Sequence, residues 1–422
     1  MALRDASPLH LSDWKSKSVI GVALVALCAG FGQFGAVAAL GNVAKGFGHV
    51  VSGTTIADQA GLSGTTIGIG LGVLRLASLV AMPLTAIADR IGRRRVLLGC
   101  CAIGLVATVG ASASPSFWWF VAIFAVGRPL LSASTAVGSV VVAEITDAPN
   151  RARGVALVTA GFGAGSGLVA LLHGAASGFF GFRGLFLLAV IPLAFMPFIG
   201  RLVSETGRFE VAKARFATAP PMLGTGHRRL LGRLVVVAMI SFGVAETSGP
   251  ATGFVYLDAQ DITKLASGVV SAMVLTAALT GIVGLYLGQL LADRLGRRLT
   301  GIVAMIGLAL ASMVTYSGGR SELFVGYSCG IFFTALLAPT AGSFVNELFP
   351  TEVRAHVAGW LVISSVLGAI AGLVGFGAIA DAGGSLRVAA IVVFAPTIVI
   401  SWLFLALPET KGLEPEAVPS PE

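Results

Sequence analysis

Four ionisable side chains stand inside long apolar stretches of this 422-residue chain, in which only 11% of residues are Asp, Glu, Lys or Arg. They are Arg75 in "GVLRLASLV", Arg128 in "FAVGRPLL", His173 in "LVALLHGAAS" and Glu246 in "ISFGVAETSGP". A charge in the middle of a bilayer costs at least ~2.5 kcal/mol, so each group needs a partner, a water-filled cavity or a function. An arginine fork binds carboxylates, and an imidazole or a buried carboxylate can carry a proton.

Each of these residues has a functional and a structural interpretation. Glu246 carries a proton or holds a cationic ligand, or else it pairs with an arginine of another helix. Arg128 binds a substrate anion or serves as a coupling partner, or else it has a structural role. Arg75 binds a carboxylate, unless it reaches outward to the membrane surface. His173 relays protons or is a packed, hydrogen-bonded histidine. Gln33 is a candidate for hydrogen bonding to a hydroxylated ligand. Hydroxyl side chains at a similar depth, which more often bond to their own backbone, are Ser132, Ser134, Thr135, Ser364 and Ser365.

The most charged segment of the chain occurs twice. The octets "ADRIGRRR" and "ADRLGRRL" lie 204 residues apart. A second motif repeats at nearly the same distance: Glu144 lies seven residues before Arg151 in "AEITDAPNR", and Glu347 lies seven residues before Arg354 in "NELFPTEVR". Two motif pairs with displacements of 204 and 203 residues indicate an internal duplication.

Long apolar stretches must position these residues, because 56% of the chain is hydrophobic. About 20 helical residues cross a bilayer, and continuous apolar runs favour helices over the alternating segments of an outer-membrane barrel. The 56 glycines allow such helices to pack closely. We predict an all-α membrane protein with twelve spanning helices, near residues 19–40, 65–88, 96–113, 117–143, 154–178, 185–202, 234–257, 265–289, 299–316, 322–346, 356–380 and 387–407.

The longest polar interruption divides these spans into six and six. We therefore predict two pseudo-symmetric six-helix bundles, at residues 1–203 and 234–407. Residues 204–233 are predicted to be a cytoplasmic linker, and residues 408–422 a cytoplasmic tail.

The basic residues predict the orientation of the chain. Most of the 28 Lys and Arg residues fall in the termini and in the loops on the side of the two octets, which the positive-inside rule places in the cytoplasm. Both termini are then cytoplasmic, and the protein lies in the cytoplasmic (inner) membrane. This orientation accounts for the net charge of +8 without a nucleic-acid partner. The few basic residues expected in loops on the other side are Lys45, Arg183, Lys264, Arg320 and Arg387.

The repeated D-R-x-G-R-R pattern after the second and eighth of twelve spans resembles the major facilitator superfamily. The segments "NELFPTEVR", "LPETKG" and "VSETGR", together with Pro339, resemble its sugar porter and metabolite:proton symporter branches. The resemblance implies a twelve-helix fold of two bundles around a central site, which opens alternately to each side of the membrane.

The same resemblance gives the repeated motifs a role. It implies that each Asp and its arginines bridge to neighbouring helix ends and hold the cytoplasmic side closed while the outer side is open. The residues expected in this latch are Asp89, Arg90, Arg93, Arg94, Glu144 and Arg151 in the first half, and Asp293, Arg294, Arg297, Arg298, Glu347 and Arg354 in the second.

The expected function is secondary transport of a small polar metabolite, an organic anion or a sugar-like compound. Coupling to protons is a further hypothesis, which rests on Glu246. The alternatives are export of organic cations, a channel-like permease, and a receptor that keeps the fold without moving a solute. No nucleotide-binding signature, metal cluster or nucleophile constellation occurs in the sequence, so we predict neither an enzyme nor a cofactor or metal. The expected partners are the substrate, lipid and protons, and we expect the protein to act as a monomer. Substrate, direction and coupling ion stay open.

Overall fold

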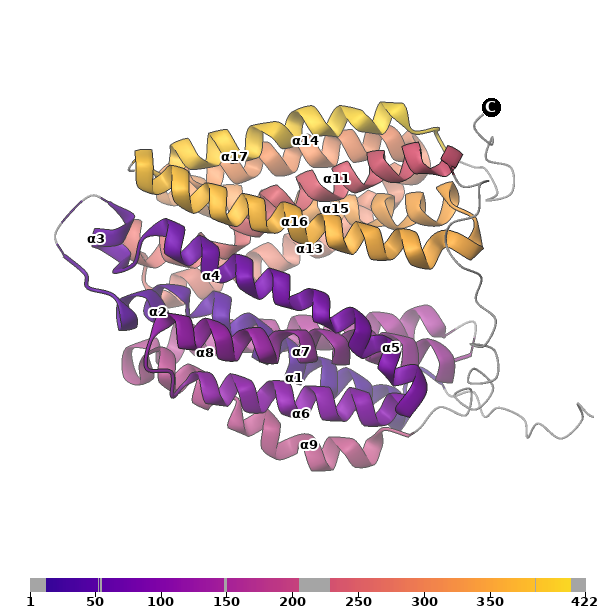
Figure 1. Ribbon diagram of the computed structural model, residues 1–422, viewed down its shortest axis with the longest axis horizontal. Coiled ribbons are helices and arrows are strands. Elements are labelled where there is room, and N and C mark those ends of the chain that lie inside the picture. The colour runs from indigo at the N-terminus through magenta and orange to yellow at the C-terminus, as the bar shows by residue number, and fades with distance from the viewer. Residues whose placement is uncertain are drawn as a thin grey trace, which may run out of the picture. The chain divides into compact units, whose positions relative to one another are not determined.

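The computed structural model describes residues 13–51, 53, 55–147, 150–204, 228–383 and 385–410, which form helices joined by short turns (Figure 1). Within these residues, 12 helical segments are long and apolar enough to cross a membrane, and each overlaps one predicted span. The all-α membrane fold is therefore confirmed. The segments are Lys17–Ala38, Gly64–Ala88, Arg93–Ala111, Phe117–Ile145, Arg153–His173, Gly181–Leu202, Leu230–Ile262, Ser267–Leu295, Arg297–Thr315, Arg320–Gly342, His356–Gly383 and Leu386–Ala406.

The contacts between residues divide the chain into two compact units. Unit 1 comprises Met1–Ala38 and Val80–Pro220. Its helix α8 contains Gly181, whose φ of 56° marks the turn between the fifth and sixth spans. The helices of unit 1 are α1 (Lys17–Ala38), α5 (Ala81–Ile91), α6 (Arg93–Ala111), α7 (Phe117–Ile145), α8 (Arg151–Leu187) and α9 (Val190–Leu202).

Unit 2 comprises Ala39–Leu79 and Pro221–Glu422. Its first three helices come from the first half of the sequence: α2 (Leu40–Phe47), α3 (Ile56–Ala60) and α4 (Gly64–Ala77). The others are α11 (Arg228–Gly253), α12 (Val255–Leu257), the π-turn η4 (Asp258–Ile262), α13 (Ser267–Leu295), α14 (Arg297–Thr315), α15 (Arg320–Leu348), α16 (Thr351–Gly383), α17 (Leu386–Ser401) and the 3-10 turn η5 (Trp402–Ala406).

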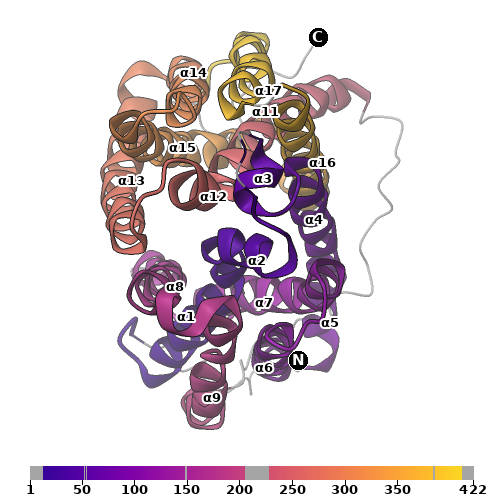
Figure 2. The same cartoon turned by 90° about the vertical axis from the view of Figure 1, so that its left-hand side faces the viewer.

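The second span is shared between the two units. Its first part, α4, belongs to unit 2 and its second part, α5, to unit 1, and the 3-10 turn η1 (Ser78–Val80) joins them. Figure 2 shows α3 and α4 beside α16. Compact units are groups of contacts rather than halves of a duplication, so the predicted domain boundaries stay a prediction.

The glycine of each octet makes the turn between two spans. Gly92 ends α5 and begins α6, and Gly296 ends α13 and begins α14. Their φ angles are 109° and 97°, which glycine adopts without the steric penalty that a Cβ brings. The repeat therefore preserves a backbone geometry as well as charges.

Close packing of helices inside each unit also depends on glycine. Helices α1 and α8 pack along their length, and a Cβ at Gly165 of α8 would collide with the carbonyl oxygen of Leu27 on α1. In unit 2, a Cβ at Gly284 of α13 would likewise strike the carbonyl oxygen of Phe332 on α15. Small residues at such contacts allow two helix backbones to approach each other in lipid.

We predict that Gly165→Val destabilises the protein while Gly163→Val does not. A side chain at position 165 meets the backbone of α1, whereas a Cβ at position 163 has no atom within 4 Å. Overpacking of this kind costs roughly 1–3 kcal/mol. Thermal melting of the detergent-solubilised protein, followed by size-exclusion chromatography, measures the difference. Equal melting temperatures for the two variants would contradict the packing of α1 on α8.

Candidate functional site

A polar recess in unit 1 brings together several side chains suggested by the sequence. Gln33 of α1 and the α7 residues Ser132 and Thr135 line it, and the Ser132 hydroxyl donates a hydrogen bond to Gln33 Oε1 at 3.2 Å. The recess has a volume of about 350 Å³, within the usual range for small-ligand pockets. Its other lining residues are Ala136, Ser139 and Phe162.

The hydroxyl groups of this recess are oriented by their own helix. Thr135 donates to the carbonyl of Leu131, and Ser139 donates to the carbonyl of Thr135. Their oxygens thus keep lone pairs for a ligand that donates hydrogen bonds. Ser139 was missed in the sequence, although it lies seven residues after Ser132 and therefore on the same helix face.

The other hydroxyl candidates have structural roles. Ser134 is buried and donates to the carbonyl of Leu131. Ser364 donates to the carbonyl of Ala238, which joins α16 to α11, and Ser365 donates to the carbonyl of Val362 in its own helix.

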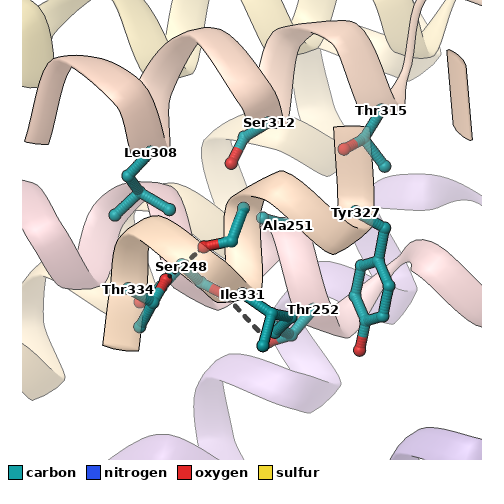
Figure 3. A pocket seen from close by; sticks show the side chains of 10 residues that line it. Ser248, Ala251, Thr252, Leu308, Ser312, Thr315, Tyr327, Ile331 and Thr334 are labelled. Carbon is teal, nitrogen blue, oxygen red and sulfur yellow. Dashed lines mark hydrogen bonds between the residues drawn. The ribbon is translucent and has the colours of Figure 1, made fainter. Parts of the chain in front are cut away.

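A second, smaller cavity lies inside unit 2. Its volume of about 10 Å³ is close to the minimum for a single water molecule. Figure 3 shows that the lining side chains converge from three helices. The hydroxyl-bearing members are Ser248 and Thr252 of α11, Ser312 and Thr315 of α14, and Tyr327 and Thr334 of α15.

The hydrogen bonds around this cavity leave acceptors facing it. Thr252, Thr315 and Thr334 donate to carbonyls of their own helices at 2.8, 2.9 and 2.8 Å. Ser312 Oγ is buried and has no hydrogen-bond partner among the described residues. The cavity therefore suits a small hydrogen-bond donor such as water. None of these residues was selected from the sequence, since hydroxyls scattered over three helices show no local motif.

Two of the four intramembrane ionisable residues have no polar partner in the described structure. Arg75 of α4 and Glu246 of α11 are both half-buried, and neither makes a hydrogen bond or ion pair with another described residue. Both helices pack against α16 in unit 2, but the two side chains do not pair with each other. Arg128 of α7 and the buried His173 of α8 differ, because each interacts with another residue.

The octet of unit 1 ties together the ends of three helices. Arg93, at the start of α6, forms an ion pair with Glu144 near the end of α7, and their side chains are only 8% and 19% exposed. Arg94 donates to the carbonyl oxygen of Gly200 in α9 at 2.8 Å. Arg90 is exposed at the end of α5. The side chains of Asp89 and Arg151 lie outside the described part of the structure.

The octet of unit 2 makes the corresponding contacts. Arg297 pairs with Asp293 at 3.1 Å and with Glu347 at 3.4 Å. Arg298 donates to the carbonyl oxygens of Phe404 and Leu405 in η5. The exposed Arg294 also interacts with another residue. Each half therefore joins its third span to its fourth by an ion pair and to its sixth by an arginine–carbonyl bond.

Two further contacts complete the unit 2 network. Glu409 accepts the backbone N–H groups of Arg297 and Arg298 at 2.9 and 3.1 Å, so it caps the N-terminus of α14. Arg354, which we expected in the latch beside Glu347, instead donates to the carbonyl oxygen of Phe349 at 2.8 Å. Glu347 instead pairs with Arg297. The seven-residue spacing between Glu347 and Arg354 gave no indication of this partner.

Comparison with known proteins gives a consistent answer. The model of the Major Facilitator Superfamily matches residues 22–316 and 234–422. A probable 4-methylmuconolactone transporter of Cupriavidus pinatubonensis is 25% identical over 296 residues, which are 67% of this chain and 67% of that protein. A putative metabolite transport protein of Haemophilus influenzae is 27% identical over 286 residues, 64% of this chain and 69% of that protein.

Solved structures share the fold at low sequence identity. A bacterial homologue of the human lysosomal transporter Spinster superposes with a TM-score of 0.72 at 13% identity, covering 93% of this chain and 97% of the other. The xylose transporter XylE from E. coli gives a TM-score of 0.71 at 16% identity, covering 95% and 99% of the two chains.

We predict that Glu347→Gln destabilises the protein more than Asp293→Asn. The Glu347 side chain is 16% exposed and Arg297 14%, so loss of this partner leaves a poorly hydrated guanidinium, at a cost of roughly 1–3 kcal/mol. The Asp293 side chain is 68% exposed, and exposed pairs contribute less than about 1 kcal/mol. Thermal melting in detergent compares the variants, and equal losses would count against Glu347 as the main partner.

Proposed function

The chain belongs to the major facilitator superfamily, and on that premise we propose that it carries a small polar organic anion across the cytoplasmic membrane by alternating access. That it is a multi-pass membrane transporter of a metabolite, and not an enzyme, follows from the family and the relatives. The substrate class, the orientation and the mechanism are the proposal.

The main support is the pair of unpartnered charges inside the spans. Arg75 and Glu246 are half-buried within α4 and α11, and in the described structure neither has a hydrogen bond or ion pair that offsets the cost of a charge in the membrane. A ligand or a proton that binds at such a position supplies the missing interaction. Arg75 presents a planar fork that matches a carboxylate, so it is assigned to the anionic group of the substrate.

The recess around Gln33, which lies within unit 1, is a separate candidate for binding a neutral polar group. Its amide and hydroxyl groups suit hydroxyl or carbonyl oxygens, and its volume of about 350 Å³ suits a small metabolite. The relative named as a probable transporter of 4-methylmuconolactone supports a small oxygen-rich compound.

Glu246 is assigned to proton coupling. A carboxylate in a membrane helix without a cationic partner can take up and release a proton as its access to water changes. Glu246 also supports the second candidate function, export of an organic cation, because the same carboxylate would hold a positive charge.

The octet networks are assigned to the cytoplasmic face and to the moving parts. Within each unit, the Arg93–Glu144 and Arg297–Glu347 pairs bind the ends of neighbouring helices, so each set of helices moves as one body. We assign the latch that closes the cytoplasmic side to Asp89 and Asp293. Asp89→Ala should then slow transport while folded protein stays in the membrane.

We predict that Arg75→Gln raises the KM for the transported anion by roughly tenfold to a hundredfold, the loss of a charge-assisted contact. The substrate is first identified by a thermal-shift screen of purified protein against carboxylates, sugars and organic cations. Uptake into proteoliposomes then measures KM, with Arg320→Gln, on the exposed first turn of α15, as a matched control. An unchanged KM in Arg75→Gln would remove Arg75 from the site.

We predict that Glu246→Gln abolishes the response of uptake to an imposed proton gradient. The amide keeps the shape of the side chain but cannot release a proton, so exchange of substrate across the membrane should persist. Counterflow in proteoliposomes measures exchange, and its absence in the parent protein would favour a channel. Gradient-driven uptake that survives in Glu246→Gln would remove this residue from coupling.

A further inference from the structure

Residues 39–79 come from the first half of the sequence but pack in unit 2 against helices of the second half. We propose that two polar contacts clasp this segment and hold closed the membrane face opposite the octets, an inference that rests on the proposed alternating access. The clasp consists of Asp381 bound to the start of α4, and of the ion pair between Lys45 and Asp261.

The chain direction places the clasp opposite the octets. The second span runs from Gly64 to the first octet, so Gly64 lies at the other end. Helix α16 begins at Thr351, shortly after Glu347 of the octet network, so Asp381 in its last turn also lies at that other end.

Asp381 makes three hydrogen bonds to the N-terminus of α4. Its carboxylate accepts the backbone N–H of Gly64 at 2.8 Å, the N–H of Thr65 at 2.8 Å and the hydroxyl of Thr65 at 2.5 Å. Hydrogen bonds to a carboxylate are roughly twice as strong as neutral ones, and the helix dipole favours a negative charge at this position. An acid from the second half thus caps a helix from the first half.

The ion pair lies on a second pair of elements. Lys45, in the last turn of α2, pairs with Asp261 in η4, whose side chain is 0% exposed. The carboxylate also rests against Gly41, where a Cβ would lie 2.6 Å from Asp261 Oδ2. A buried carboxylate that loses its cation must gain water, so the ion pair disfavours a partial separation of α2 from η4.

The backbone is interrupted where the clasped segment meets unit 1. Helix α1 ends at Ala38 and α2 begins at Leu40, and the 3-10 turn Ser78–Val80 separates α4 from α5. The two breaks coincide with the ends of the segment that packs in unit 2. The segment can therefore leave α16 as one piece when the clasp releases, with the bending confined to its ends.

The seam between α4 and α16 is suited to separation. Gly64 and Gly68 of α4 lie so close to α16 that a Cβ at either position would press on the carbonyl oxygens of Gly377 and Leu373. Because glycine has no side chain, α4 and α16 can separate here without interlocked side chains having to move. The polar contacts at the end of this helix pair therefore decide whether the two helices stay together. This is why we assign the holding role to Asp381 and Lys45.

The test measures separation of the segment directly and needs no substrate. Spin labels at the exposed positions His49 and Arg387, in a variant without the four native cysteines, report the distance between the segment and the second half by double electron–electron resonance. Asp381→Asn and Asp261→Asn should raise the population with longer distances by about tenfold, the equivalent of one charge-assisted hydrogen bond. Thr65→Val, which removes only the hydroxyl contact, should give a smaller rise and is a milder change for folding.

Asp58→Asn is the matched control. Asp58 lies in the same segment and carries the same charge, but among the described residues its side chain accepts only the N–H of Thr55, the residue that caps α3. Its distance distribution should equal that of the parent. A distribution in Asp381→Asn that equals that of Asp58→Asn would overturn the clasp.

Labelling of Ala136→Cys in the recess connects the clasp to access. An impermeant maleimide added to intact cells should react faster with this cysteine in Asp381→Asn than in Asp58→Asn. Labelling of inside-out vesicles is the control that shows whether the cysteine can react at all. If it can, equal rates in intact cells would overturn the gating role of the clasp. If position 136 is labelled from neither side while the spin-label distances lengthen, the clasp is supported and the recess is rejected as the transport site. Failure of the clasp and failure of the proposed function are thus distinguishable.

Discussion

The cost of a charge in lipid is the constraint on which this structure depends. The buried arginines at the ends of the third and ninth spans are held by partners, Arg93 by Glu144 and Arg297 by Glu347. Arg75 and Glu246 differ from these arginines, because they lie within spans and lack a polar partner among the described residues. The same physical rule thus identifies both the structural braces and the candidate site.

The duplicated octet combines a backbone requirement with an electrostatic one. Glycine permits the positive φ that turns one span into the next, and the two arginines after it reach different neighbours. The first arginine meets a carboxylate at the end of the fourth span, and the second meets backbone carbonyls at the end of the sixth. A short loop can therefore organise the ends of three helices in each half.

The sequence allowed the spans and the octets to be predicted because both leave a local signal. Length and hydropathy locate a membrane helix, and a repeated motif locates its counterpart. Gln33 and Ser132 were found because polar side chains are conspicuous in apolar helices. Asp381 and Glu409 were missed, since each bonds to backbone N–H groups of a helix more than 100 residues away. The sequence around each acid contains no motif that identifies the helix to which it binds.

The packing of residues 39–79 with the second half was also beyond prediction. Hydrophobic periodicity shows that a segment is helical, but it does not show which helix covers each face. The division of the second span at Ser78–Val80 arises from contacts with two different groups of helices. The sequence therefore predicts where the spans lie, but it does not predict which helices pack against each other.

The two contacts of the clasp would leave different traces in related sequences. Lys45 and Asp261 contact each other through side chains, so a change at one position favours a compensating change at the other. Asp381 bonds mainly to backbone N–H groups, which every residue except proline supplies at positions 64 and 65. Covariation between positions would then reveal the ion pair and overlook the helix cap. At the cap, the acid would be retained without a matching change elsewhere, while position 64 would stay small because of its packing against Gly377.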